Sequence, residues 1–155
     1  QRVQALSRDI EDIECKLALW KKEDAAAKRL MAIPGVGLLT ATAAVATIGD
    51  AKVFKNGRQF AAFLGLVPRQ AGTGGTVRLF GTSKRGDTYL RKLLIHGARS
   101  VITHQKARAP WLEQLLARRP FNAAVVALAN KMARTIWALL AHDRTYQNGV
   151  TAQAA

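Results

Sequence analysis

The segment from Pro68 to Thr82 limits the possible folds more than any other part of the chain. Four glycines surround the β-prone run Thr76 to Phe80, which is the only convincing β segment in the sequence. One loop with a strand or hairpin cannot build a sheet-based core. Elsewhere alanine and leucine dominate, and apolar residues recur at helical spacings of three and four. We therefore predict a mostly α, helix-hairpin-helix-containing domain with one small β-hairpin or loop element.

The first helical pattern carries a narrow apolar stripe between charges of both signs. Its spacing is typical of a coiled-coil seam, although the helix is too short to be stable alone. It can pair with a second copy or lie on its own domain, and both alternatives stay open. We assign residues 1–31 to this helical segment, 32–145 to the main domain and 146–155 to a frayed tail. The seam consists of Val3, Leu6, Ile10, Ile13, Leu17 and Trp20.

A Pro-Gly-Val-Gly sequence, Pro34 to Gly37, separates two helical patterns. The second pattern is the alanine-rich run 38–48. This spacing is typical of a helix-hairpin-helix motif, in which glycines allow a tight turn and amides at the start of the second helix bind a phosphate. We predict that Gly35 and Gly37 lie at a nucleic-acid contact. The alternative is that the turn only packs against the domain.

Positive charge is concentrated in one block of the chain. The formal net charge is +14, and residues 52–119 hold 14 of the 24 Lys and Arg but only two of the ten Asp and Glu. Such clustering is typical of a protein that binds a polyanion, whereas a basic surface that only aids solubility needs no segregation. We predict that DNA or RNA is the partner. The candidate binding side chains are Arg69, Arg78, Lys84, Arg85, Arg91, Lys92 and Arg99.

Several classes of site are excluded by residue type. Six of the ten acids lie in residues 1–31, so the basic block cannot hold the convergent carboxylates of a metal-dependent nuclease. The three histidines lack ligand spacing, and the single Cys15 fits a reducing cytoplasm. No run reaches the roughly 18–20 uncharged apolar residues of a membrane span. We predict no metal site and no membrane partner.

Two hydroxyls remain as candidate nucleophiles. Thr73 stands between glycines within the segment that holds both Arg69 and Arg78, and Ser83 is followed by Lys84-Arg85. Either hydroxyl could attack phosphorus if a base or metal came from elsewhere. By residue type alone, both are more often loop or capping hydroxyls.

Four ordered blocks, residues 33–50, 58–70, 72–75 and 78–99, together carry a resemblance to a known family. They resemble the C-terminal transposase domain of the bridge-RNA-guided DEDD transposases, the Piv/MooV-like group of insertion-sequence 110/1111 type. The match is strong over residues 25–104. The resemblance implies a preceding RuvC-like domain with four metal-binding acids and a coiled-coil linker helix, of which residues 1–31 would be the end. No cofactor is expected in this chain, and Mg²⁺ is expected on that RuvC-like domain.

The resemblance also implies a mechanism and partners. In the family, a serine in the glycine-rich loop attacks DNA and forms a covalent link, while a guide RNA pairs with donor and target DNA. The position of this serine falls on Thr73. Three possibilities therefore remain open: the nucleophile is Thr73, it is Ser83, or this variant has lost cleavage activity. The implied partners are DNA, guide RNA and a second copy through the N-terminal helix, in a bacterial cytoplasm. The alternative is a non-catalytic helix-hairpin-helix scaffold that binds DNA or RNA.

The charge distribution generates a first prediction. Affinity for nucleic acid should fall steeply between about 50 and 200 mM salt, because bound cations release condensed counterions from the phosphates. Fluorescence anisotropy of a labelled duplex measures this dependence. A binding constant that stays flat over that range would contradict the polyanion interpretation.

Overall fold

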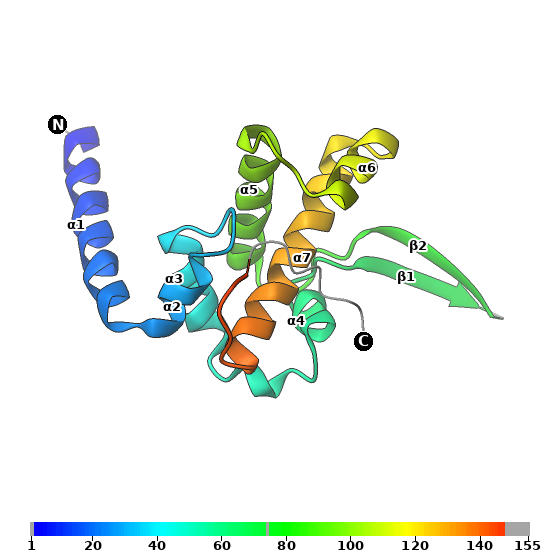
Figure 1. The fold of residues 1–155 in the computed structure, drawn as a ribbon, viewed down its shortest axis with the longest axis horizontal. Helices are drawn as coiled ribbons and strands as arrows, with labels where there is room; N and C mark the ends of the chain where they lie inside the picture. Colours follow the sequence, from blue (N-terminus) through cyan, green and yellow to red (C-terminus); the bar gives the residue numbers. More distant parts are fainter. Residues whose placement is uncertain (1, 74, 148–155) are drawn as a thin grey trace.

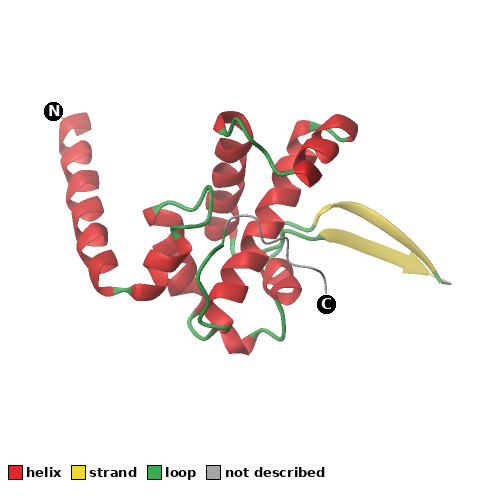
Figure 2. Cartoon of the chain, viewed as in Figure 1, coloured by secondary structure: helices red, strands yellow, loops and turns green. Residues whose placement is uncertain are grey.

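The computed structural model describes residues 2–73 and 75–147, which form seven α-helices, one 3-10 turn and one antiparallel β-hairpin. The prediction of a mostly helical fold with one small β element is therefore confirmed (Figures 1 and 2). Of the predicted tail, residues 148–155 lie outside the described part. The helical elements are α1 (Arg2–Glu23), α2 (Ala25–Leu30), α3 (Leu38–Ile48), η1 (Ala51–Val53), α4 (Gly57–Phe63), α5 (Thr88–His104), α6 (Pro110–Arg118) and α7 (Phe121–Ala141).

Helix α7 is the centre of the core. It packs against α2, α4, α5 and α6, and its buried residues follow spacings of three and four. By length and composition it is the one described helix that could cross a membrane. Its apolar face is instead buried in the domain, as expected of a core helix. Lys131 and Arg134 of the same helix are exposed. The buried residues are Ala124, Val125, Ala129, Met132, Ala133, Ile136 and Leu139.

The turn between α2 and α3 packs against α5. Gly35 has a φ of +83°, and a Cβ there would lie 2.8 Å from the carbonyl oxygen of Gly97. A Cβ on Gly97 would lie 2.1 Å from the carbonyl oxygen of Gly35. The two glycines thus let the turn and the helix approach backbone to backbone. Gly37 is exposed, and a Cβ there would meet nothing within 4 Å.

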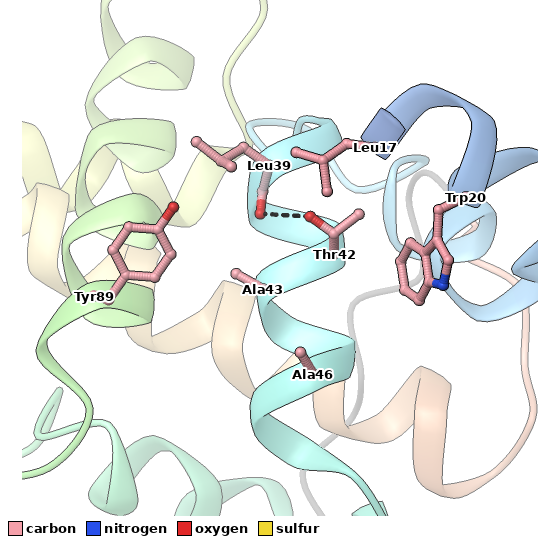
Figure 3. Close-up of a pocket in the computed structure, with 7 residues that line it drawn as sticks. All are labelled: Leu17, Trp20, Leu39, Thr42, Ala43, Ala46 and Tyr89. Carbon is pink, nitrogen blue, oxygen red and sulfur yellow. Dashed lines mark hydrogen bonds between the residues drawn. The ribbon is translucent and has the colours of Figure 1, made fainter. Parts of the chain in front are cut away.

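Helix α1 extends away from the rest of the domain and only its last turns contact it (Figure 1). Ile10 and Ile13 are each 56% exposed. Leu17 and Trp20 lie beside α3, where a shallow apolar groove of about 320 Å³ opens (Figure 3). The predicted seam is therefore divided, with an exposed N-terminal part and a C-terminal part on its own domain. The groove is lined by Leu17, Trp20, Leu39, Thr42, Ala43, Ala46 and Tyr89.

Capping explains two helix boundaries. Asp24 accepts hydrogen bonds from the amides of Ala26 and Ala27, so α1 ends and α2 begins there, where the sequence predicted a continuous helix. Asp87 accepts from the amide of Leu90 at 2.8 Å and begins α5.

The glycine-rich segment forms a single hairpin of β1 (Pro68–Thr73) and β2 (Thr76–Thr82). It projects from the helical body, and no described helix packs on either face of it (Figures 1 and 2). The open choice between a loop and a hairpin is thereby settled for the described residues. An isolated two-stranded hairpin is marginally stable in water, so the contacts at its base are decisive.

Candidate nucleic-acid interface

The two faces of the hairpin differ in charge. Residues directly opposite each other in an antiparallel pair project to the same face. Ala71 is opposite Arg78, whereas Gln70 is opposite Leu79 and Gly72 is opposite Val77. One face, here called the cationic face, is formed by Arg69, Ala71, Thr76, Arg78 and Phe80. The other, here called the uncharged face, is formed by Pro68, Gln70, Gly72, Val77, Leu79 and Thr82.

A β-bulge brings Arg69 close to the aromatic ring of Phe80 on the cationic face. Between the pairs Pro68–Thr82 and Gln70–Leu79, two residues of β2 stand opposite the single Arg69. The guanidinium carbon of Arg69 lies 5.4 Å from the centroid of the Phe80 ring. At this distance the two groups form a cation–π pair.

The base of the hairpin is held by a tight backbone crossing. Gly65 and Gly86 have φ values of +70° and +100°. A Cβ on Gly65 would lie 2.1 Å from the carbonyl oxygen of Arg85, and one on Gly86 would lie 1.7 Å from that of Phe63. Side chains larger than hydrogen are therefore excluded at both positions. The amide of Lys84 donates to the carbonyl oxygen of Gly65 at 3.2 Å across the crossing.

Two helix side chains form hydrogen bonds with the backbone just before the hairpin. Nη1 of Arg91 donates to the carbonyl oxygen of Leu64 at 3.0 Å, and its Nη2 donates to Oγ1 of Thr88 at 3.2 Å. From α7, Nδ2 of Asn130 donates to the carbonyl oxygen of Leu66 at 2.9 Å. The hydrogen bonds to Leu64 and Leu66 anchor the hairpin to α5 and α7. Their acceptors are backbone carbonyl oxygens that precede β1 and have no partner in the β-ladder.

The structure corrects the prediction for Arg91. Its side chain is only 8% exposed and its guanidinium is used inside the protein, so it is not free to bind a phosphate. Lys92, His96 and Arg99 are exposed on α5, and their spacings of four and three place them on one side of the helix. Arg99 also donates to Oδ1 of Asn122 at 3.4 Å.

Exposed cations are found both at the base of the hairpin and along α5. Lys84 and Arg85 are exposed at the hairpin base, and Lys92 and Arg99 are exposed along the helix. At a rise of about 1.5 Å per residue, Lys92 and Arg99 are separated by about 10 Å along the helix axis. The segment from residue 51 to 86 contains no Asp or Glu. Phosphates approaching the hairpin would therefore meet no carboxylate of that segment.

The two candidate nucleophiles occupy opposite ends of the hairpin. Thr73 is the last residue of β1, with its backbone opposite Thr76. Ser83 is half-buried beside the base, where its amide donates to the carbonyl oxygen of Val67 at 2.8 Å. A strand of this length spans roughly 20 Å, so the two residues cannot act on one phosphorus. They are alternatives.

The donor set near the hairpin does not fit Mg²⁺. In the described ranges, no group of three or more His, Cys, Asp and Glu side chains could hold a metal ion. Asp87, the nearest carboxylate in sequence, already caps α5. Mg²⁺ prefers several oxygen ligands including carboxylates, so the side chains described around the hairpin are unsuited to binding it.

Two further ionisable groups lie away from the hairpin. Lys131 stands over the Trp111 ring, with Nζ 4.5 Å from the ring centroid. Although the residue is exposed, partial burial of its amine, and secondarily the charge of Arg134, lower the pKa of Lys131. His104 lies at the end of α5 with Nδ1 3.0 Å from the carbonyl oxygen of Ser100.

The sequence matches a known family over most of the domain. The profile of the Transposase IS116/IS110/IS902 family matches residues 27–112. The chain is 51% identical over 151 residues to a probable family 20 transposase of Pseudomonas aeruginosa, an alignment covering 95% of this chain and 45% of that protein. The chain belongs to the IS116/IS110/IS902 transposase family. The predicted insertion-sequence 110/1111 resemblance is confirmed.

Other relatives agree in name and in coverage. The transposase for insertion sequence element IS1111A of Coxiella burnetii is 47% identical over 150 residues, 93% of this chain and 41% of that protein. The transposase for IS1328 of Yersinia enterocolitica is 43% identical over 136 residues, 85% of this chain and 41% of that protein. This transposase domain therefore spans less than half the length of these relatives.

Two residues of this interface were missed by sequence reasoning. Phe80 belongs to a β-prone run and resembles an ordinary strand residue, although its alternation with Arg78 places both on one face. Asn130 gave no signal, because its partner Leu66 is 64 residues away in the sequence. Non-local hydrogen bonds of this kind are not encoded in local spacing.

The burial difference on α5 generates a second prediction. Arg91→Ala should lower the free energy of unfolding by about 1–3 kcal/mol, because the buried carbonyl oxygen of Leu64 loses its donor. Lys92→Ala combined with Arg99→Ala should leave stability nearly unchanged. The double variant should weaken binding to different sequences alike and lower the salt slope by about one per lost phosphate contact.

Urea unfolding and anisotropy titrations measure the two effects separately. If Arg91→Ala unfolds at the wild-type urea concentration, the anchoring role is wrong. If the double variant loses affinity for one sequence alone, these side chains read bases.

Proposed function

We propose that this domain binds DNA and guide RNA and presents a hydroxyl nucleophile for strand cleavage and transfer by the full-length transposase. The observation that carries the proposal is the anchored hairpin, which has its cations on one face and ends β1 at Thr73. It stands clear of the helical body, so a nucleic acid can reach it from several sides (Figure 1). The family membership supports transposition as the process served.

Thr73 is proposed as the nucleophile. Its hydroxyl oxygen would attack a DNA phosphorus, the bond from phosphorus to the neighbouring strand oxygen would break, and a Thr73–DNA phosphodiester would form. The hydroxyl proton goes to a base from outside this chain, and the departing DNA oxygen takes up a proton. Cations of the hairpin such as Arg78 would offset charge that develops on the phosphoryl oxygens.

The remainder of the protein is needed for this chemistry. The described residues near the hairpin lack both a carboxylate set and an evident general base. We propose that a RuvC-like domain elsewhere in the full-length protein supplies the acids that would hold Mg²⁺. The isolated chain is accordingly expected to bind nucleic acid without cutting it.

A non-catalytic scaffold is the second candidate. Threonine in place of the family serine favours it, since the extra methyl group crowds attack on phosphorus. Gly37 favours it too, because this exposed residue is the N-cap of α3 and a Cβ on it would meet nothing within 4 Å. In this case the turn from α2 to α3 would act as a helix-hairpin-helix contact. Covalent adduct formation distinguishes the two candidates.

The location and assembly follow from the same proposal. DNA and guide RNA would be met in the bacterial cytoplasm. Pairing of α1 with a second copy would cover the exposed part of its seam, because a narrow apolar stripe is buried best against an equal partner.

The nucleophile assignment generates a third prediction, for the full-length protein. Thr73→Ala should abolish strand exchange and the covalent protein–DNA adduct, while nucleic-acid binding persists. Thr73→Ser should preserve or increase activity, because it keeps the hydroxyl and removes the methyl group. Denaturing gels of labelled DNA reveal the adduct.

Ser83→Ala is the control variant for this experiment. It should cost less activity, because Asp87 rather than Ser83 caps α5. If Thr73→Ala recombines normally and Ser83→Ala is inactive, the nucleophile is Ser83. If neither change matters, the chemistry belongs to the rest of the protein.

The exposed seam generates a fourth prediction. Ile10→Glu combined with Ile13→Glu should reduce the oligomer size, because both side chains are exposed in a single copy and would be buried in a pair. The helical core should remain folded. Light scattering measures the mass, and equal masses for the variant and the wild type would contradict pairing through α1.

A further inference from the structure

Phe80 is an exposed aromatic ring that no described helix covers. It is 45% exposed on the cationic face, although burying an aromatic side chain normally contributes strongly to stability. The ring is also held in place, because the guanidinium of Arg69 lies over it at 5.4 Å. A half-exposed ring that is paired with a cation on a protruding element is arranged for contact with a partner.

The chemistry around the ring identifies the class of partner. Arg69 and Arg78 share its face, and the hairpin contains no acid. Aromatic rings and guanidinium planes between cations are the groups on which unpaired nucleobases stack. A paired base inside a duplex presents only its edges in the grooves, so its flat face is not available to Phe80.

We propose that Phe80, held by Arg69, is a stacking site for an unpaired nucleobase. The proposal rests on the proposed function as a nucleic-acid-binding domain and deepens it. Phosphates bind along the exposed cations of α5, whereas the hairpin binds a strand whose bases are unpaired. The bulge at Arg69 is the structural device that brings the two stacking groups together.

A nucleic-acid strand that runs along the hairpin with one base stacked on Phe80 would have a fixed position relative to Thr73, the end of β1. Phe80 is four residues along β2 from Thr76, which stands opposite Thr73. Four residues of strand span about 14 Å. At a rise of about 3.4 Å per stacked nucleotide, this distance corresponds to about four nucleotides. A base stacked on Phe80 would thereby select which phosphate lies near the hairpin tip.

The test uses a DNA duplex with a short single-stranded gap that holds one 2-aminopurine. The same duplex with the gap filled is the matched probe. Stacking on an aromatic side chain quenches 2-aminopurine, and anisotropy reports total binding in the same titration. We expect the wild-type protein to quench the gapped probe and to bind it more tightly than the filled one.

Phe80→Leu keeps an apolar side chain on the hairpin but removes the ring. It should lose the quenching and lower affinity for the gapped probe about 5- to 150-fold, the range measured for base–aromatic stacking. Affinity for the filled duplex should stay unchanged. Phe80→Tyr should restore the wild-type result.

Leu79→Ala is the matched control, because Leu79 is an exposed neighbour, at 64%, on the uncharged face. It should behave as the wild type. Equal quenching by Phe80→Leu and wild type, or no preference for the gapped probe, would overturn the stacking site while salt-dependent duplex binding still supports the proposed function. Absence of binding to either probe would overturn both.

Discussion

The backbone crossing of Gly65 with Gly86 is the constraint on which the interface depends. The chain ends α4, passes through β1 and β2 and returns to the same point to begin α5. Because the two glycines approach each other's segments without side chains, the incoming and outgoing strands leave the body together. Lys84 adopts a φ of 55° beside the crossing, a left-handed conformation that costs a non-glycine residue about 1–3 kcal/mol. The neighbouring hydrogen bonds and packing must offset that cost.

The crossing also fixes the position of the hairpin relative to α5, the two elements that carry the exposed cations. Asp87 begins α5 one residue after Gly86, so the exposed cations of the helix start where the hairpin ends. Arg91 strengthens this relation from the buried side of the same helix. A single helix therefore anchors the hairpin with one arginine and, through the proposed phosphate contacts, meets nucleic acid with the residues beside it. The position of each surface relative to the other does not depend on a flexible linker.

Local spacing predicted the helical fold, because each helix depends on apolar residues within one or two turns of each other. It did not predict what Arg91 does. Charge alone placed Arg91 with the phosphate-binding residues, whereas the helical period that joins Lys92, His96 and Arg99 leaves it out. Its partner Leu64 is 27 residues away and becomes a neighbour only when the crossing forms. Gly35 shows the same limit, since its close contact with Gly97 is invisible in the Pro-Gly-Val-Gly pattern.

The absence of acids between residues 51 and 86 follows from the demands of the proposed chemistry. A surface that receives a polyanion is weakened by carboxylates, since two like charges at 4 Å repel by about 1 kcal/mol in water and more where water is excluded. A divalent metal site requires those carboxylates, so one surface serves both purposes poorly. Cations can offset charge on a phosphoryl group, but a permanently charged guanidinium cannot accept the proton of a threonine hydroxyl. Under the proposed function, binding and the hydroxyl therefore belong to this domain, whereas proton transfer and metal binding belong to another part of the full-length protein.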